Sequence, residues 1–363
     1  MSSVDQSAVF DALRSVMDPD LHRDIVALGF VKNLEIDGGR VAFTIELTTP
    51  ACPVKDAMRD QARAAVEAVP GVTSVDVTMT AAVRSAGTML AGRAPVPGVR
   101  NVVAIGAGKG GVGKTTLAVN LAAALAARGS RVGMIDGDVY GPNVPIMLGM
   151  QGQLEAAGEK IVPIERHGIK AVSMGFLMDG ESPVIWRGPM LHSVVRQFFN
   201  DVLWGELDYL LIDMPPGTGD VALSLSQTVP VAGAIVVTTP QEVSLADSRR
   251  AVRMYQKLNI PVLGLIENMS YFACPNCQHE SNVFGRGGGE RTAQAMDVPF
   301  LGRIPIYEPI CRGGDSGQPL VIGEPESAAA RAFFSAAEQL AAQVSIASFQ
   351  KPESGIQNSE FRR

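Results

Sequence analysis

Gly108–Thr115 reads Gly-Lys-Gly-Gly-Val-Gly-Lys-Thr, the spacing of a glycine-rich loop that cradles nucleotide phosphates. The glycines let successive backbone N–H groups turn toward phosphate oxygens, and the start of a following helix adds the positive end of its dipole. Lys114 is predicted to contact the β and γ phosphates, and the Thr115 hydroxyl is predicted to hold Mg²⁺. The first prediction is therefore a nucleotide site.

The segments on either side of this loop have the composition of a strand and a helix. The apolar run Val102–Ile105 precedes it, and the alanine-rich stretch Leu117–Arg128 follows and ends at Gly129. These flanking elements favour a nucleotide site over a glycine-rich turn that binds nothing. ATP is favoured over GTP because the guanine-reading string Asn-Lys-x-Asp does not occur in the chain.

Acidic residues follow two further apolar runs. Asp136 and Asp138 come after Val132–Ile135, where a metal or an attacking water would lie, and we predict that Asp138 positions the water. Asp213 ends the run Tyr209–Ile212, an arrangement in which a carboxylate orients Mg²⁺ or its water ligands. The alternative for the first pair is two surface aspartates at a turn.

Cys274 and Cys277 stand three positions apart, and two thiolates at this spacing can bind one metal ion or one edge of a cluster. They supply two ligands, whereas zinc sites and cubane clusters usually need about four. Three completions stay open. They are a zinc site with His279 and Cys311, a redox disulfide, and a twofold dimer in which each copy gives two cysteines to one [4Fe-4S] cluster.

Composition limits the class of protein. With 363 residues, two domains are expected, and a net charge of −6 disfavours a strongly basic nucleic-acid binder. The first ten residues lack a basic region followed by an apolar core, and no run approaches about 18 apolar residues, so neither a leader nor a membrane span is expected. Four cysteines are too few for a disulfide scaffold, which favours the reducing cytoplasm.

Hydrophobic patterns predict a small α+β domain over residues 1–82. Its expected elements are a helix at 4–17, a hairpin of 30–36 with 41–47, a helix at 54–68 and a strand at 72–79. Residues 83–100, which are rich in Ala, Gly, Pro and Arg, are predicted to form a flexible linker. The polar residues 347–363 are predicted to form a tail.

Residues 101–346 are predicted to form an α/β domain. Nearly all-apolar runs of strand length alternate with helical segments, as in a parallel sheet covered by helices on both faces. These runs are 102–105, 132–135, 171–174, 209–212, 234–237, 262–266 and 300–304. Ligands in such folds bind at the carboxyl ends of the strands, where the glycine-rich loop and the acidic residues lie.

The string Gly108–Thr116, with a second lysine at Lys109, resembles the deviant P-loop of the ATPases related to MinD, ParA and the nitrogenase iron protein. In that class the extra lysine reaches the nucleotide of the partner copy, so the resemblance implies an ATP-dependent homodimer. It also implies that Asp138 polarises the water, that Asp136 lies nearer the metal and that Asn268 contacts adenine. The alternative for the asparagine is a turn-forming role.

Other strings resemble the Mrp-type members of this class. Met214–Asp220 is similar to their second switch, and Trp186–Met190 is similar to another family string. Asp18–Leu21 and Thr48–Pro53 are similar to their small N-terminal iron–sulfur assembly domain. Cys52 lies at a turn into a helix, where a lowered thiol pKa would favour a reactive thiolate or metal ligand, and packing as a small hydrophobic residue is the alternative.

The whole chain resembles the Mrp/ApbC family of P-loop iron–sulfur cluster carriers. The resemblance implies a P-loop NTPase fold with a mostly parallel twisted sheet, and a [4Fe-4S] cluster bound by Cys274 and Cys277 of two copies for delivery to apo-proteins. ATP and Mg²⁺ are the implied cofactors, with no stable nucleic-acid partner and no membrane partner. The implied catalytic residues are Lys109, Lys114 and Asp138. The implied nucleotide-binding residues are Gly108, Lys109, Gly110, Gly111, Val112, Gly113, Lys114, Thr115, Thr116, Asp136, Asp213 and Asn268.

Two other functions stay open. A positioning ATPase that travels on DNA or membrane would need a basic surface or an amphipathic membrane helix. The last helical stretch, 326–344, is alanine-rich without a basic cluster, which weighs against membrane docking. The other possibility is an ATPase whose cysteines bind a structural zinc ion.

Overall fold

The computed structural model describes residues 4–87, 94–138, 141–176, 194, 196–217, 220–274, 276–277 and 279–350, without the side chains of Asp220, Val221 and Ser224. The predictions for Trp186–Met190, for Thr218 and Gly219 of the switch string, and for 351–363 of the tail lie outside the described residues. Within them, no helix is both long and apolar enough to cross a membrane.

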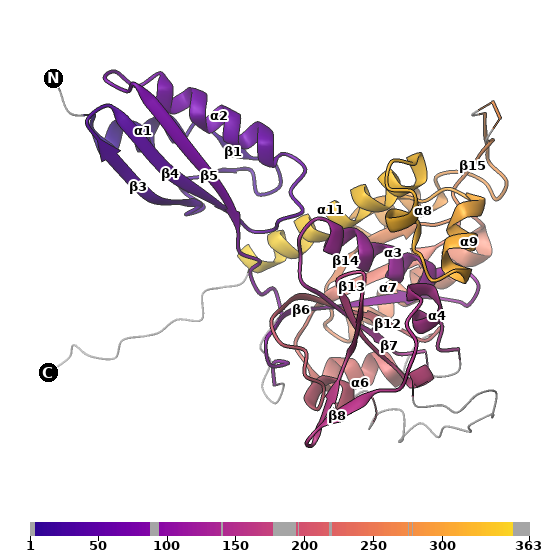
Figure 1. The fold of residues 1–363 in the computed structure, drawn as a ribbon. Helices are drawn as coiled ribbons and strands as arrows, with labels where there is room; N and C mark the ends of the chain where they lie inside the picture. The colour runs from indigo at the N-terminus through magenta and orange to yellow at the C-terminus, as the bar shows by residue number, and fades with distance from the viewer. Residues whose placement is uncertain are drawn as a thin grey trace, which may run out of the picture.

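The N-terminal part contains two helices packed on a small sheet (Figure 1). Its elements are α1 (Gln6–Leu13), β1 (Met17–Asp18), β2 (Arg23–Asp24), β3 (Val31–Asp37), β4 (Arg40–Leu47), α2 (Lys55–Glu67) and β5 (Ser74–Ala81). β3 and β4 form the predicted antiparallel hairpin, and β4 pairs with β5 in parallel. The first helix ends four residues before the predicted 17, because the chain turns into β1 there.

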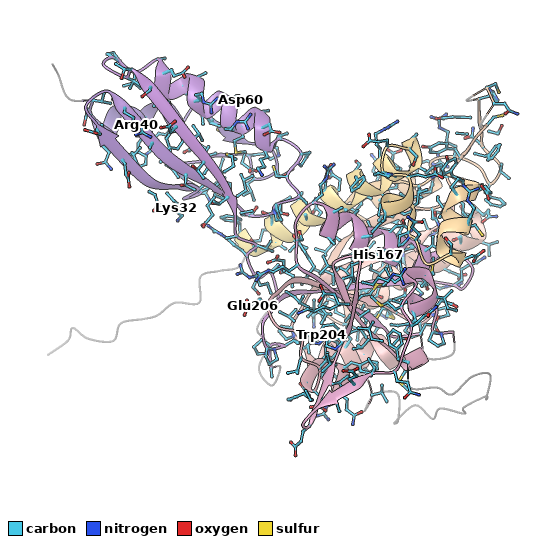
Figure 2. The ribbon with its side chains drawn as sticks, viewed as in Figure 1. Lys32, Arg40, Asp60, His167, Trp204 and Glu206 are labelled. Atoms are coloured by element: carbon cyan, nitrogen blue, oxygen red, sulfur yellow. The ribbon has the colours of Figure 1, made fainter. Side chains whose placement is uncertain are left out.

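Spacing explains how this part buries its core. Met58, Ala62 and Val66 recur every four residues on α2 and are buried, while alternate residues of β4 from Val41 to Leu47 face the same core. On the outer side, the Arg40 guanidinium, labelled in Figure 2, pairs with the Asp76 carboxylate at 2.6 Å. The small α+β unit is thus built on ordinary helix and strand amphipathicity.

The larger part contains one twisted sheet with the order β10-β11-β7-β12-β6-β13-β14-β17 among the described residues. Its strands are β6 (Val99–Ala107), β7 (Val132–Asp136), β10 (Ile164–Arg166), β11 (Ile169–Ser173), β12 (Leu207–Asp213), β13 (Val231–Thr238), β14 (Val262–Glu267) and β17 (Phe300–Arg303). The seven predicted runs are all strands of this sheet and pair in parallel. The sequence reading missed β10, which adds an antiparallel edge.

Helices cover both faces of this sheet (Figure 1). They are α3 (Lys114–Ala127), α4 (Val144–Leu148), α6 (Asp220–Thr228), α7 (Glu242–Lys257), α8 (Gly288–Ala295), α9 (Glu308–Asp315), α10 (Leu320–Gly323) and α11 (Ala328–Phe349), with a 3-10 turn at Met174–Phe176. Along β6, Val103 and Ile105 join the core under α3 and α11, whereas Val102 and Ala104 join the core under α6 and α7. The central strand is buried on both faces, as its apolar run predicts.

The predicted flexible linker, 83–100, is bound to the larger part at both ends. Val83 and Ala86 are buried against the sheet core. The buried Asn101 amide accepts a hydrogen bond from the Ala86 backbone at 2.7 Å, and Arg100 donates to the Val83 carbonyl at 2.5 Å. The Asn101 and Arg100 side chains thus hold the backbone of residues 83–86 against the larger part. The prediction of a flexible linker is wrong for these residues.

The predicted tail also begins too early, because α11 continues through Phe349. The Phe349 ring lies 6.3 Å from the Phe30 ring of the N-terminal part and under the Arg84 guanidinium. Nearby, the Ser345 hydroxyl donates to the Thr48 hydroxyl at 2.8 Å. The end of α11 is therefore a contact between the two parts of the chain.

Besides the pairs β1–β2 and β10–β11, two further short hairpins were not predicted. The first pairs β8 (Glu155–Ala157) with β9 (Lys160–Val162). The second pairs β15 (Phe272–Ala273) with β16 (Glu280–Ser281) and projects from the body of the larger part (Figure 1). The cysteine pair lies at the tip of this second hairpin, named here the cysteine hairpin.

Candidate functional site

The glycine-rich loop connects β6 to α3 in a conformation that requires its glycines. Gly111 and Gly113 have φ values of 77° and 79°, a left-handed region that other residues rarely adopt. A Cβ at Gly113 would overlap the Asn268 amide nitrogen, and one at Gly108 would overlap the Asp247 backbone. The loop therefore ends at the N-terminus of a buried helix, as the predicted phosphate cradle requires.

Lys114, Thr115 and Asp213 meet at the ends of α3 and β12. The Lys114 ammonium lies 2.5 Å from one Asp213 carboxylate oxygen, and the Thr115 hydroxyl donates to the other at 2.6 Å. Burial raises the pKa of Asp213, and the Lys114 charge opposes that effect. The structure thus brings together the predicted phosphate-binding lysine and the two predicted Mg²⁺-binding groups.

Asp136 lies beside them, because β7 and β12 pair with Asp136 opposite Asp213. One of its carboxylate oxygens accepts from the Asp138 backbone at 3.2 Å, and the other accepts from the Val144 backbone at 3.2 Å and the Ser173 hydroxyl at 3.0 Å. Burial, followed by the nearby Asp213 charge, raises the pKa of Asp136 to about 7. Asp136 therefore holds the start of the loop that carries Asp138.

Replacing Asp136 by asparagine is expected to flatten the pH dependence of folding stability. The folded wild type keeps the proton up to about pH 7, whereas the unfolded carboxyl loses it near 3.8. Wild-type stability therefore decreases as pH rises through this window, by up to about 4 kcal/mol at about 1.36 kcal/mol per pKa unit. Urea unfolding of both proteins across that window tests this, and parallel pH profiles for the two would contradict it.

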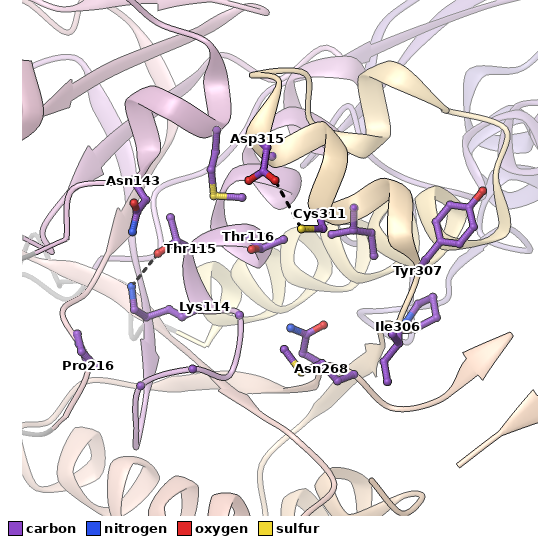
Figure 3. Close-up of a pocket in the computed structure, with 18 of the residues that line it drawn as sticks. Lys114, Thr115, Thr116, Asn143, Pro216, Asn268, Ile306, Tyr307, Cys311 and Asp315 are labelled. Atoms are coloured by element: carbon purple, nitrogen blue, oxygen red, sulfur yellow. Dashed lines mark hydrogen bonds between the residues drawn. The ribbon is translucent and has the colours of Figure 1, made fainter. Parts of the chain in front are cut away.

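A cavity of about 900 Å³ opens over the loop (Figure 3), within the range of small-molecule sites. One wall carries Lys109, Lys114, Thr115, Thr116 and Asp138. Ile306, Tyr307 and Cys311 lie across the cavity from Lys114, whereas Asn143 and Pro216 lie on the Lys114 side (Figure 3). Pro216 belongs to the switch string and Cys311 was a candidate ligand. The other lining residues were not predicted to belong to a site, and they include Ile146, Met147, Met269, Phe272, Val283, Phe284, Pro305, Ile310, Gly314 and Asp315.

Asn268 lies on the cavity wall and is 7% exposed. Its amide nitrogen donates to the Val112 carbonyl of the glycine-rich loop at 2.8 Å (Figure 3 shows its position). This contact gives the residue a loop-holding role that the sequence did not reveal. The predicted contact with adenine stays a prediction.

The cysteine hairpin presents both thiols at its tip. The Cys274 backbone N–H donates to the His279 carbonyl at 3.0 Å and closes the turn, and Cys277 is exposed. Backbone N–H groups of Cys277 and Asn276, with the Cys277 side chain, lower the pKa of Cys274. A lowered thiol pKa favours the thiolate, which is the form that ligates metals.

Other metal-binding groups do not surround the pair in the part of the chain that is described. There, no three His, Cys, Asp or Glu side chains are arranged to hold one metal ion. Cys311 lies instead on α9 in the cavity wall, with its thiol 3.7 Å from an Asp315 carboxylate oxygen (Figure 3). The His279 backbone lies beside Cys274, but the described residues do not arrange the His279 side chain or Cys311 with the cysteine pair as a metal site.

Cys52 does not have the expected lowered pKa. Burial is the main influence and raises the pKa of its thiol, and it outweighs the Val54 backbone hydrogen bond at the helix start, which lowers the pKa. The nearby Asp18 and Asp20 charges raise it further. The side chain packs against the core of the N-terminal part. The prediction of a thiolate favoured by the helix start is wrong, and the structure favours the packing alternative.

Comparisons with known proteins agree with this architecture. A family model described as NUBPL iron-transfer P-loop NTPase matches residues 98–341, and one described as iron-sulfur cluster assembly protein matches residues 6–77. An "Iron-sulfur cluster carrier protein" of Synechocystis sp. is 49% identical over 346 residues, which cover 94% of this chain and 98% of that protein.

Two solved structures have a similar fold. A nucleotide-binding protein of Archaeoglobus fulgidus, in complex with ADP, is 36% identical with a TM-score of 0.56, over 64% of this chain and 91% of that one. The cell division ATPase MinD of Pyrococcus furiosus is 26% identical with a TM-score of 0.51, over 66% of this chain and 98% of that one. These neighbours confirm the predicted P-loop NTPase fold class.

Proposed function

Because the chain belongs to the family of NUBPL-type iron-transfer P-loop NTPases, we propose that it is an ATP-dependent carrier of [4Fe-4S] clusters. Two copies would hold one cluster between their Cys274 and Cys277 thiolates and transfer it to apo iron–sulfur proteins. The observation that carries the proposal is the shared cavity, because its lining includes the phosphate loop together with Phe272 and Val283 at the root of the cysteine hairpin.

The nucleotide half of the proposal rests on fit. The loop Gly108–Thr116 begins a buried helix, Lys114 provides a cation for the phosphates, and Thr115 with Asp213 provides the oxygens that Mg²⁺ prefers. Bound MgATP would supply a transferable γ-phosphoryl group. Asp138 would orient the attacking water, and Lys109 would reach the nucleotide of the partner copy.

The cluster-binding half of the proposal rests on the number of thiols and on the protonation state of Cys274. Each chain offers two at one exposed hairpin tip, and the lowered pKa of Cys274 suits a thiolate ligand. Four thiolates are needed for a [4Fe-4S] cluster, and a twofold axis supplies them from two copies. The cluster is cargo in this proposal, so the exposed site suits both loading and release.

We also propose that residues 1–82 act as a separate domain beside the ATPase domain, and that the protein works in the reducing cytoplasm, where free thiols persist. A positioning ATPase and an ATPase with structural zinc are the competing functions. They differ from the carrier in what the cysteines bind.

The proposal is tested by an anaerobic transfer assay. The reconstituted protein is mixed with an apo iron–sulfur enzyme, and recovery of enzyme activity is followed with MgATP, with MgADP and without nucleotide. A carrier activates the enzyme at a nucleotide-dependent rate even when a chelator traps free iron. Activation that the chelator abolishes in every nucleotide state would mean that the protein only releases iron.

A further inference from the structure

We propose that Glu267 is a positioning residue that couples the phosphate loop to the cysteine hairpin, so that the nucleotide changes how the two thiols are presented. This inference rests on the proposed function, because it explains how nucleotide at the phosphate loop would affect cluster binding at the cysteine hairpin. Glu267 ends β14 and is fully buried.

The Glu267 carboxylate binds both ends of the segment that contains the cysteine hairpin. At the entry, one oxygen accepts from the Ser270 hydroxyl at 2.5 Å. At the exit, the same oxygen accepts from the Gly287 backbone at 3.2 Å, and the other accepts from the Gly289 backbone at 2.5 Å. A single side chain therefore closes the root of the excursion from 271 to 286, which includes Cys274 and Cys277.

The exit segment has little room to move independently of β14. A Cβ at Gly289 would lie 2.9 Å from the Glu267 Cβ, and one at Gly288 would lie 2.6 Å from a Leu245 methyl group. Packing this close transmits displacement, because well-packed interiors do not deform freely. A shift at the end of β14 must therefore move the start of α8 and, with it, the root of the hairpin.

The residue next to Glu267 holds the phosphate loop. Asn268 donates through its side chain to the Val112 carbonyl at 2.8 Å, and its backbone donates to the Thr238 carbonyl at 2.8 Å. The hairpin also touches the opposite cavity wall, since the Ile306 backbone donates to the Tyr271 carbonyl at 2.6 Å. Consecutive residues of one strand end thus contact the nucleotide loop and the cysteine hairpin.

A change in the phosphate loop on nucleotide binding would be carried to the hairpin through these contacts, provided that the nucleotide binds the changed loop more tightly. The carboxylate is the part of the path that a substitution can remove without touching the cavity, because Glu267 does not line it. In Glu267→Gln, the amide NH₂ group would face at least one backbone N–H donor, so the clamp loses a hydrogen bond while the side chain keeps its shape.

The test measures alkylation of each cysteine in the full-length, cluster-free, reduced protein by peptide mass spectrometry, with and without MgATP. Cys311 is exposed in the cavity wall and reports nucleotide occupancy, whereas Cys274 and Cys277 report the hairpin. In the wild type we expect MgATP to protect Cys311 and to change the alkylation rates of the hairpin thiols about fivefold, the lower end of typical coupling between sites.

In Glu267→Gln, the Cys311 protection is expected to persist while the nucleotide effect on the hairpin thiols disappears. Glu290→Gln is the matched control, because Glu290 is exposed in the first turn of α8 and pairs with Arg303 outside the clamp. That control should behave like the wild type. If Glu267→Gln fails to fold, Ser270→Ala removes the entry contact alone and should reduce the effect.

Two results would overturn the inference. One is a folded clamp variant that keeps the full nucleotide effect on Cys274 and Cys277. The other is a wild type in which MgATP protects Cys311 but leaves the hairpin thiols unchanged. The second result would leave the carrier function standing, whereas loss of both nucleotide protection and cluster binding would defeat the proposed function itself.

Discussion

Replacing Lys114 by alanine is expected to reduce nucleotide affinity about 100-fold, because two charge-assisted hydrogen bonds to phosphate are each worth about 1.5 kcal/mol or more. The same change should destabilise the fold. Lys114 is buried and its ammonium lies 2.5 Å from the fully buried Asp213 carboxylate. Removing one partner of a buried ion pair typically costs about 3–5 kcal/mol. Nucleotide titration and urea unfolding measure the two losses.

The two effects of Lys114→Ala can be separated. Without the lysine, burial is opposed only by the Thr115 hydrogen bond, and the folded-state pKa of Asp213 rises further above the unfolded value. The stability of the variant should therefore decrease as pH increases from about 4. Adding Asp213→Asn removes the unpaired charge and should restore most of the stability without restoring nucleotide affinity. Recovery of affinity in the double variant would contradict the assigned role of Lys114.

Replacing both Cys274 and Cys277 by alanine is expected to abolish cluster binding completely. The thiols lie at the tip of the hairpin, where Cys277 is exposed, and the described residues provide no other set of metal-binding groups around them. Iron and sulfide analysis after anaerobic reconstitution should therefore give background values in the variant. Nucleotide binding should persist, because neither thiol lines the cavity.

Single substitutions of the other two cysteines provide the controls. Cys52→Ser changes a thiol in the core of the N-terminal part, and Cys311→Ser changes one in the cavity wall. Both should retain full iron and sulfide content. A loss of cluster in Cys311→Ser equal to that of the double variant would show that the cluster is bound within one chain and would contradict sharing between two copies.

The sequence predicted the parts of the site whose functional residues are neighbours in the chain and follow a recognisable local pattern. Gly108–Thr115 needs a strand, a turn and a helix in order, and all three follow from adjacent residues. Asp213 and Asp136 end apolar runs, and parallel pairing alone places them opposite each other. The sequence predicted the strands and the acidic residues that end them, whereas the pairing of β7 with β12, which brings the two aspartates together, is a contact between distant segments.

The other half depends on contacts between distant segments. The cavity wall formed by Ile306, Tyr307 and Ile310 has no periodic signature, and its position follows from how α9 docks. In the sequence, Glu267 is simply the last residue of an apolar strand. Its carboxylate accepts hydrogen bonds from the backbone of Gly287 and Gly289, about 20 residues later, which no local pattern indicates. Linker composition likewise predicted flexibility where Asn101 and Arg100 bind the backbone.

The central claim is that two copies share one cluster, and native mass spectrometry of the anaerobically reconstituted wild type tests it most directly. The account predicts a species with the mass of two chains and a single [4Fe-4S] cluster, converted to cluster-free chains when Cys274 and Cys277 are replaced. A species of one chain with one zinc ion bound through the same two cysteines would contradict it.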